Sequence, residues 1–252
     1  MIPISGLTWL FNGAVSLLIA WRLHKTYLGS QDQEKPVLKY FVLFFLNMGI
    51  FLIAIFIPHI AVFNHKYAYL FPKIMAWAHD GPFHVFLYVA FAYIVSVPLQ
   101  LYFPKIRGPY FVFIIVAGVI TVAFTTYFAP QYPSRFDSSS GLTFLAHHPL
   151  VGKVTERTLA IISFAPAIII FLIKGLPSPH KFVRIRSLLF IFGFVMMAVA
   201  GPLNAAADTA KEVLLGNTLT LIGFLFIAAG IFYKREWVEE APGLHASPDL
   251  ST

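Results

Sequence analysis

The 252-residue sequence contains no cysteine, and only 12% of its residues are charged. The absence of cysteine excludes disulfides, thiolate metal ligands, iron–sulfur clusters and cysteine nucleophiles. An average soluble domain carries roughly 25% charged residues, so this chain is not an ordinary soluble globule. Apolar residues are in excess instead, because 58% of the chain is hydrophobic and the mean hydropathy is +0.77. This balance is typical of a polytopic helical membrane protein.

Seven segments are apolar over about the 20 residues that a helix needs to cross a bilayer. They cover residues 5–22, 38–62, 73–98, 109–129, 155–173, 183–206 and 211–233. We therefore expect an all-α fold with one seven-helix transmembrane domain over residues 1–235. The remaining stretch, 236–252, is acidic and then rich in Pro, Ser and Gly, which predicts a disordered cytoplasmic tail.

Lysine and arginine predict the orientation, because cytoplasmic loops retain these residues. Seven spans place only six of the eighteen on one side, namely Lys66, Lys73, Arg135, Lys153, Arg157 and Lys211. We therefore expect a multi-pass protein of the plasma membrane with its N-terminus outside and its C-terminus inside. Contact with anionic lipid headgroups accounts for the net charge of +7, so no nucleic-acid partner is expected.

Polar side chains inside the predicted spans gather in their outer halves. Polar groups are costly in hydrocarbon and face a cavity or the bundle interior, so they indicate a functional site. We predict an outward-facing polar chamber, with the loop histidines His147 and His148 as a candidate lid. Its predicted lining is Asn12, His59, Trp77, His79, Asp80, His84, Asn204, Asp208 and Asn217.

The sharpest motif is Trp77-Ala-His-Asp-Gly-Pro-Phe-His84 in the third span. Pro82 has no amide hydrogen, so the helix is expected to kink there. Asp80 and His84 are four residues apart and share a helix face, where a carboxylate would orient the imidazole for metal binding or general-base chemistry. The structural alternative is that these side chains form interhelical hydrogen bonds with Asn204, Asn217 or Asp208.

The predicted function is sensor-like or receptor-like binding of a small ligand or lipid in the chamber. The topology is similar to that of the seven-helix sensor modules that precede some prokaryotic histidine kinases. Because the 252 residues include no kinase, cyclase or DNA-binding domain, signalling would require a separate signalling protein or a second copy of the chain. A microbial rhodopsin is excluded, because the last span has only Lys211, at its edge, for a retinal Schiff base.

The first alternative is a metal- or haem-binding enzyme or redox protein that uses His59, His79, His84 and Asp80. Zinc with three such ligands and an open position would suit a membrane hydrolase, whereas haem b would need two axial histidines, His59 and His79. The ceramidase and adiponectin-receptor type of hydrolase is not implied, because residues 211–233 contain no histidine. The second alternative is a small-solute transporter, although the inner halves of the spans offer few polar groups beyond Asn47 and Ser96.

Overall fold

The computed structural model describes residues 4–32, 34–63, 70–78, 81–128, 135–137, 143–145, 150–205, 207 and 209–233. Its elements, in chain order, are α1 (Ile4–Leu28), α2 (Lys35–Phe63), α3 (Phe71–Ala78), the 3₁₀ turn η2 (Pro82–His84), α4 (Val85–Tyr102), α5 (Pro104–Phe128), β1 (Arg135–Asp137), β2 (Thr143–Leu145), α6 (Leu150–Ile170), the π-helical turn η4 (Phe171–Gly175), α7 (Lys181–Ala205) and α8 (Ala210–Phe232).

Seven helical segments of the described residues are long and apolar enough to cross a membrane, which confirms the predicted number. They are Gly6–Leu28, Lys35–Ile60, Pro82–Tyr102, Pro104–Tyr127, Val154–Gly175, Lys181–Asn204 and Lys211–Phe232. The all-α prediction holds for all seven. The structure also contains a two-stranded antiparallel hairpin between α5 and α6, which the sequence analysis did not predict. Strand β1 pairs with β2 so that Phe136 lies opposite Phe144.

The third span differs most from its prediction. The sequence predicted one kinked helix over residues 73–98, and this prediction is wrong. The structure has two separate helices instead, α3 before Gly81 and α4 after η2. Gly81 has an extended backbone, with φ −110° and ψ −153°, and Pro82 cannot donate the amide hydrogen that would continue the helix. The amide of His84 donates to the Gly81 carbonyl at 3.0 Å and starts the new helix. His84 therefore lies at the beginning of a spanning helix.

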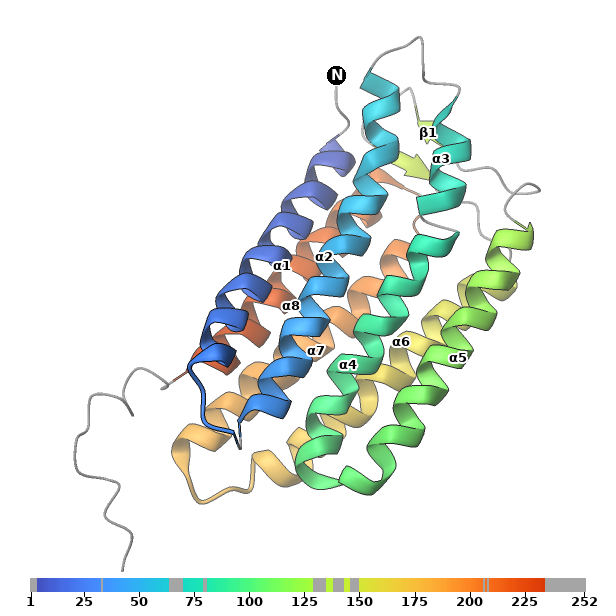
Figure 1. Cartoon of the computed structure of the whole chain (residues 1–252). Helices are drawn as coiled ribbons and strands as arrows, with labels where there is room; N and C mark the ends of the chain where they lie inside the picture. Colours follow the sequence, from blue (N-terminus) through green and yellow to red (C-terminus); the bar gives the residue numbers. More distant parts are fainter. Residues whose placement is uncertain are drawn as a thin grey trace, which may run out of the picture.

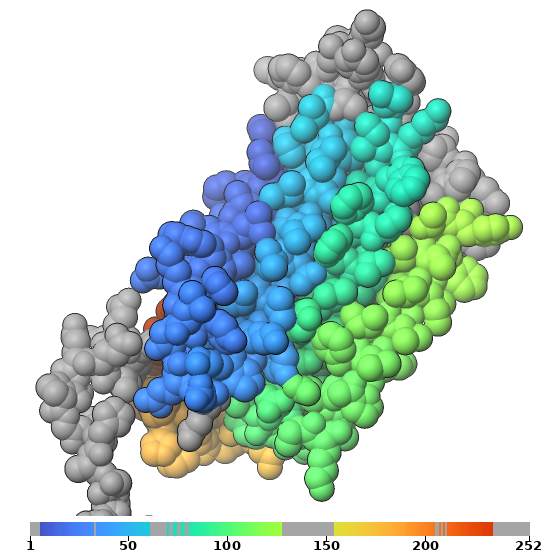
Figure 2. Space-filling model, in the orientation of Figure 1, coloured from blue at the N-terminus to red at the C-terminus, as the bar shows by residue number. Residues whose placement is uncertain are grey.

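The spanning helices form a bundle of two layers, with α1, α2, α4 and α5 in one layer and α8, α7 and α6 in the other (Figure 1). Helices α1, α4, α6 and α8 begin, and α2 and α7 end, at the same end of the bundle, which we call the upper end. Figure 2 shows the first layer as adjacent bands of side chains. Helix α5 exposes apolar residues such as Val112 and Ile120, as contact with lipid tails requires.

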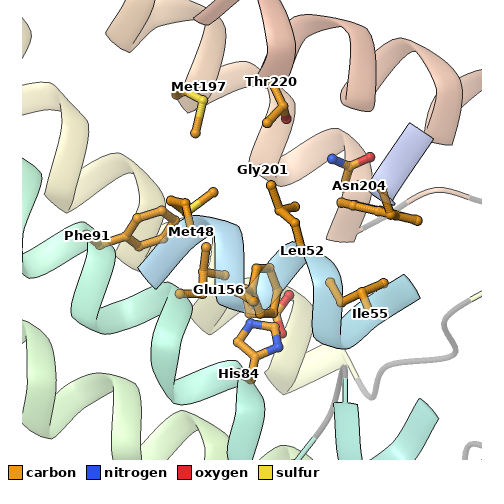
Figure 3. Close-up of a pocket in the computed structure, with 13 residues that line it drawn as sticks. Met48, Leu52, Ile55, His84, Phe91, Glu156, Met197, Gly201, Asn204 and Thr220 are labelled. Carbon is orange, nitrogen blue, oxygen red and sulfur yellow. The ribbon is translucent and has the colours of Figure 1, made fainter. Parts of the chain in front are cut away.

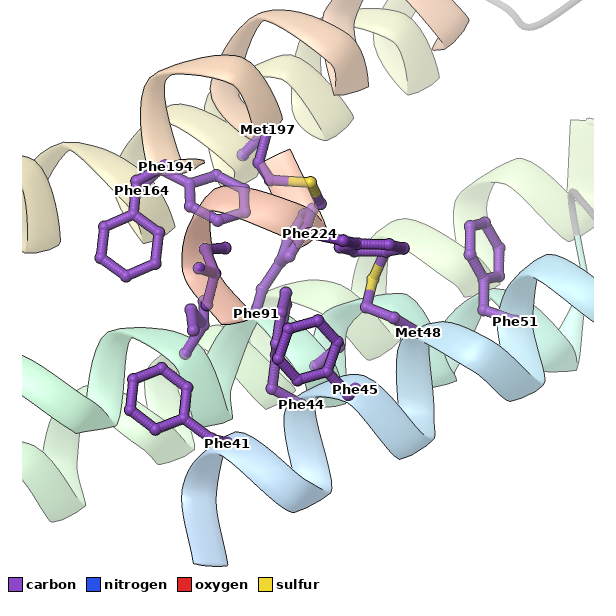
Figure 4. Packing of buried hydrophobic residues seen from close by; sticks show 14 of the residues in the cluster. Phe41, Phe44, Phe45, Met48, Phe51, Phe91, Phe164, Phe194, Met197 and Phe224 are labelled. Atoms are coloured by element: carbon purple, nitrogen blue, oxygen red, sulfur yellow. The ribbon is translucent and has the colours of Figure 1, made fainter. Parts of the chain in front are cut away.

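Buried aromatic side chains of α2, α4, α6, α7 and α8 form a large part of the core (Figure 4). Phe45 contacts Phe224 edge to face with ring centroids 5.5 Å apart, and Phe91 contacts Phe164 in the same manner at 5.2 Å. All four rings are buried. The buried histidines and the buried glutamate of the described residues lie toward the upper end.

Close crossings hold neighbouring helices together within each layer. In α1 and α2, Gly13 and Gly49 face each other, and a Cβ atom built on Gly13 would lie 3.4 Å from the Gly49 carbonyl oxygen. In α7 and α8, a Cβ on Gly193 would lie 3.0 Å from the carbonyl oxygen of Gly223. Small residues at such crossings let helix backbones approach closely, which is a main source of packing energy in membranes.

Candidate functional site

A buried cavity of about 60 Å³ lies among six spanning helices near the upper end (Figure 3). Its size suits about four water molecules or a small polar group. Only α5 among the spanning helices does not contribute to the lining. The lining residues are Trp9, Met48, Phe51, Leu52, Ile55, His84, Leu87, Phe91, Glu156, Met197, Gly201, Asn204 and Thr220.

His84 and Glu156 form the ionisable pair of this cavity. His84 Nε2 lies 3.6 Å from Glu156 Oε1, and the two side chains are only 3% and 9% exposed. Figure 3 shows the Glu156 carboxylate beside the His84 ring. The break at Gly81 and Pro82 places His84 at the first turn of α4, and Glu156 lies in the second turn of α6 at a matching depth. The pair therefore joins two spanning helices from opposite layers.

Aromatic rings hold the His84 imidazole from two sides. The Phe51 ring of α2 contacts it edge to face at 5.0 Å between centroids, and Tyr88, one turn along α4, lies at 5.2 Å. Tyr88 is itself buried against Gly118 of α5, where any Cβ atom would collide with the Tyr88 ring. The imidazole has little freedom to rotate away from Glu156, so the pair is held in place.

Asn204 and Trp9 supply further polar atoms to the lining. Asn204 Oδ1 and Trp9 Nε1 are buried, and neither has a hydrogen-bond partner among the residues that the structure describes. The amide of Asn204 packs directly on the Gly216 backbone, and Trp9 is 5% exposed. Thr220 donates its hydroxyl to the Gly216 carbonyl at 2.9 Å. Two residues of the lining thus carry one buried donor and one buried acceptor without a described partner.

His59 lies apart from this cavity. Its side chain is fully buried, its Nδ1 lies 3.0 Å from the Ile55 carbonyl oxygen, and its ring packs under Gly6 of α1, where a Cβ atom would lie 2.9 Å away. The described residues contain no group of three His, Cys, Asp or Glu side chains arranged to hold a metal. Because His79 and Asp80 lie outside the described residues, the zinc or haem b alternative stays a prediction.

Asn12 and Asn217 do come together, but on the other side of the α1–α8 contact. Asn12 Nδ2 donates to the Asn217 carbonyl at 2.8 Å, and Asn217 Nδ2 donates to Thr8 Oγ1 at 2.7 Å. Neither asparagine lines the cavity. Trp77 is 65% exposed and does not line it either. Of the predicted lining, the cavity thus contains His84 and Asn204.

The other predicted site residues lie outside the described residues. They are His79, Asp80 and Asp208 of the predicted chamber and the candidate lid residues His147 and His148. The expected pairing of Asp80 with His84 therefore stays a prediction.

Sequence reasoning missed Glu156 and Trp9. Glu156 is the second residue of the predicted span 155–173 and is followed by Arg157, a position typical of a charge at the membrane interface. The depth of Glu156 in its span could have identified it, because its carboxylate lies about one turn inside the helix end, as the His84 ring does. Comparisons of the chain with protein-family models, curated proteins and solved structures found no match.

Proposed function

We propose that this multi-pass membrane protein is a sensor- or receptor-like protein that binds a small polar ligand in the cavity among the six helices. The observation that carries the proposal is the lining itself, in which the His84–Glu156 pair and the free atoms of Trp9 and Asn204 share one buried cavity. Intramembrane ionisable groups that face a cavity mark a functional site.

The lining indicates the chemical class of the ligand. Trp9 Nε1 is a hydrogen-bond donor and Asn204 Oδ1 is an acceptor, so a hydroxyl or a primary amide satisfies both. Met48, Phe51, Phe91 and Met197 offer an apolar wall for a short carbon chain. The volume of about 60 Å³ restricts the ligand to one small polar group with few carbons.

Binding at this position can change the packing of the whole bundle. The ligand would contact α1, α2, α4, α6, α7 and α8 together, so a small difference in their spacing would change its affinity. A ligand shifts a conformational equilibrium by its difference in affinity for the two states. The positive-inside rule places the upper end outside the cell, so the ligand would arrive from that side, and the signal would pass to a separate protein or a second copy of the chain.

The experiment is a thermal-shift measurement on the purified protein in lipid nanodiscs, with acetamide, ethanol and 1-propanol as probes and acetone, which has no donor, as the matched compound. Two variants serve as a matched pair. Gly201→Ala places a methyl group into the cavity, and Gly108→Ala adds one to α5 where nothing lies within 4 Å. Both glycines lie in helices directly before a proline.

We expect the hydroxyl or amide probes to raise the melting temperature of the wild type and of Gly108→Ala, and to have a much smaller effect on Gly201→Ala. Acetone is expected to have less effect on all three proteins. Equal shifts in Gly201→Ala and Gly108→Ala would show that the probes act outside the cavity and would contradict the proposal.

A further inference from the structure

A second hollow lies on the membrane-facing side of the α1–α8 contact. It is a groove of about 280 Å³, and every residue that lines it belongs to the spanning segments of α1 and α8. The cavity described above lies on the other side of the same contact, because neighbouring residues Trp9 and Thr220 line that cavity and not this groove. The groove residues are Leu7, Thr8, Phe11, Asn12, Asn217, Thr218 and Leu221.

Two buried asparagines line the groove. Asn12 and Asn217 are 2% and 1% exposed, and their amide groups donate to the Asn217 carbonyl and to Thr8 Oγ1. Asn217 Oδ1 accepts no hydrogen bond from any residue that the structure describes. A buried polar atom without a partner is expensive at membrane depth, where no bulk water can satisfy it.

The remaining groove residues are suited to an acyl chain. Leu7 and Phe11 are 45% and 57% exposed, so they present apolar surface toward the bilayer. Thr218 directs its hydroxyl to the Leu214 carbonyl of its own helix at 2.8 Å. Asn217 lies seven residues after the start of α8, about 10 Å along the helix, so a lipid donor that reaches it lies in the part of the span nearest the upper end.

We propose that this groove binds a membrane lipid that carries a hydrogen-bond donor at the level of its glycerol or amide linkage, and that this donor pairs with Asn217 Oδ1. A free hydroxyl, as in diacylglycerol, meets this requirement, whereas a lipid without a donor at this level does not. The acyl chain lies against Leu7, Phe11 and Leu221. The site is separate from the ligand cavity and does not depend on its function.

The test uses two photoreactive lipids that differ in one functional group. One is a diacylglycerol with a diazirine in its acyl chain, and the other is the same lipid with its hydroxyl capped as a methyl ether. Each is incorporated at equal density into phosphatidylcholine vesicles that contain the full-length protein. Labelled peptides are then quantified after illumination. The proposal predicts about three- to fivefold more labelling of the peptides around Phe11 and Leu221 by the uncapped lipid, as one hydrogen bond provides.

Two variants separate a lipid contact from loss of helix packing. Asn217→Leu removes the acceptor and is expected to abolish the preference for the uncapped lipid. Thr8→Val keeps the shape of the groove and removes the same hydrogen bond between α1 and α8, so it is expected to retain the preference. Equal labelling of the wild type by both lipids would overturn the proposal, and so would a loss of preference in Thr8→Val as large as in Asn217→Leu.

Discussion

The His84–Glu156 pair makes a quantitative prediction about coupling between α4 and α6. Replacing either residue alone by leucine leaves the other buried without the opposite charge of the pair, and replacing both removes that penalty. At 3.6 Å and an effective dielectric constant of about 20, the direct attraction of two unit charges is about 4 to 5 kcal/mol. Desolvation cancels most of it, and measured polar couplings in membrane helices reach about 1.7 kcal/mol.

We therefore expect a coupling free energy of about 1.5 kcal/mol in a double-mutant cycle of His84→Leu and Glu156→Leu. Each single variant should lower the free energy of unfolding by about 2 kcal/mol, and the double variant should lower it by about 2.5 kcal/mol, well short of the sum of about 4 kcal/mol that additive effects would give. The assay is reversible unfolding by sodium dodecyl sulfate in mixed lipid–detergent micelles, followed by tryptophan fluorescence and circular dichroism.

A control cycle pairs His84→Leu with Thr158→Leu. Thr158 is exposed on α6, two residues after Glu156, and its hydroxyl bonds to the Val154 carbonyl of its own helix. This cycle should be additive within about 0.5 kcal/mol. Additive behaviour of His84 and Glu156 as well would refute the inference that the two side chains interact across the bundle.

Three further predictions concern helix packing and orientation. Gly201→Ala and Gly108→Ala should change the free energy of unfolding by similar amounts, because each glycine lies in a helix directly before a proline and neither new methyl group meets a close neighbour; a loss of stability in Gly201→Ala alone would contradict the open space beside it. Gly193→Leu should destabilise the protein by about 3 kcal/mol, measured in the same unfolding assay, because its Cβ atom would lie 3.0 Å from the carbonyl oxygen of the facing glycine in α8. On intact cells, a cysteine at Ser139 should react with an impermeant thiol reagent and one at Ser178 should not, and the reverse pattern would invert the proposed orientation.

Much of the fold could be predicted from the sequence, because the length and apolarity of a spanning helix are local properties. The seven segments follow from them, and the errors lie at helix ends and at the third span. There, Pro82 predicted a kink, and the extended backbone of Gly81 turns the kink into a break between α3 and α4. Whether a helix bends or stops depends on the conformation of one neighbouring residue, which sequence periodicity does not specify.

The candidate site was harder to predict, because it depends on which way each helix faces. The sequence predicted a polar chamber near one end of the spans, and two of the residues that it named, His84 and Asn204, line the cavity. It could not show that His59, Asn12 and Asn217 face other directions, since helix order and rotation are set by packing between distant segments. The Gly13–Gly49 and Gly193–Gly223 crossings bring consecutive helices close together, and glycine spacing alone does not identify such a crossing.

A cryo-electron microscopy map of the protein in lipid nanodiscs, at a resolution that shows ordered water, tests directly whether the cavity holds a ligand. We expect non-protein density in the cavity, within hydrogen-bond distance of Trp9 Nε1 and Asn204 Oδ1, with Glu156 beside His84. A cavity closed by protein side chains, or a Glu156 carboxylate turned outward to the headgroups, would contradict it.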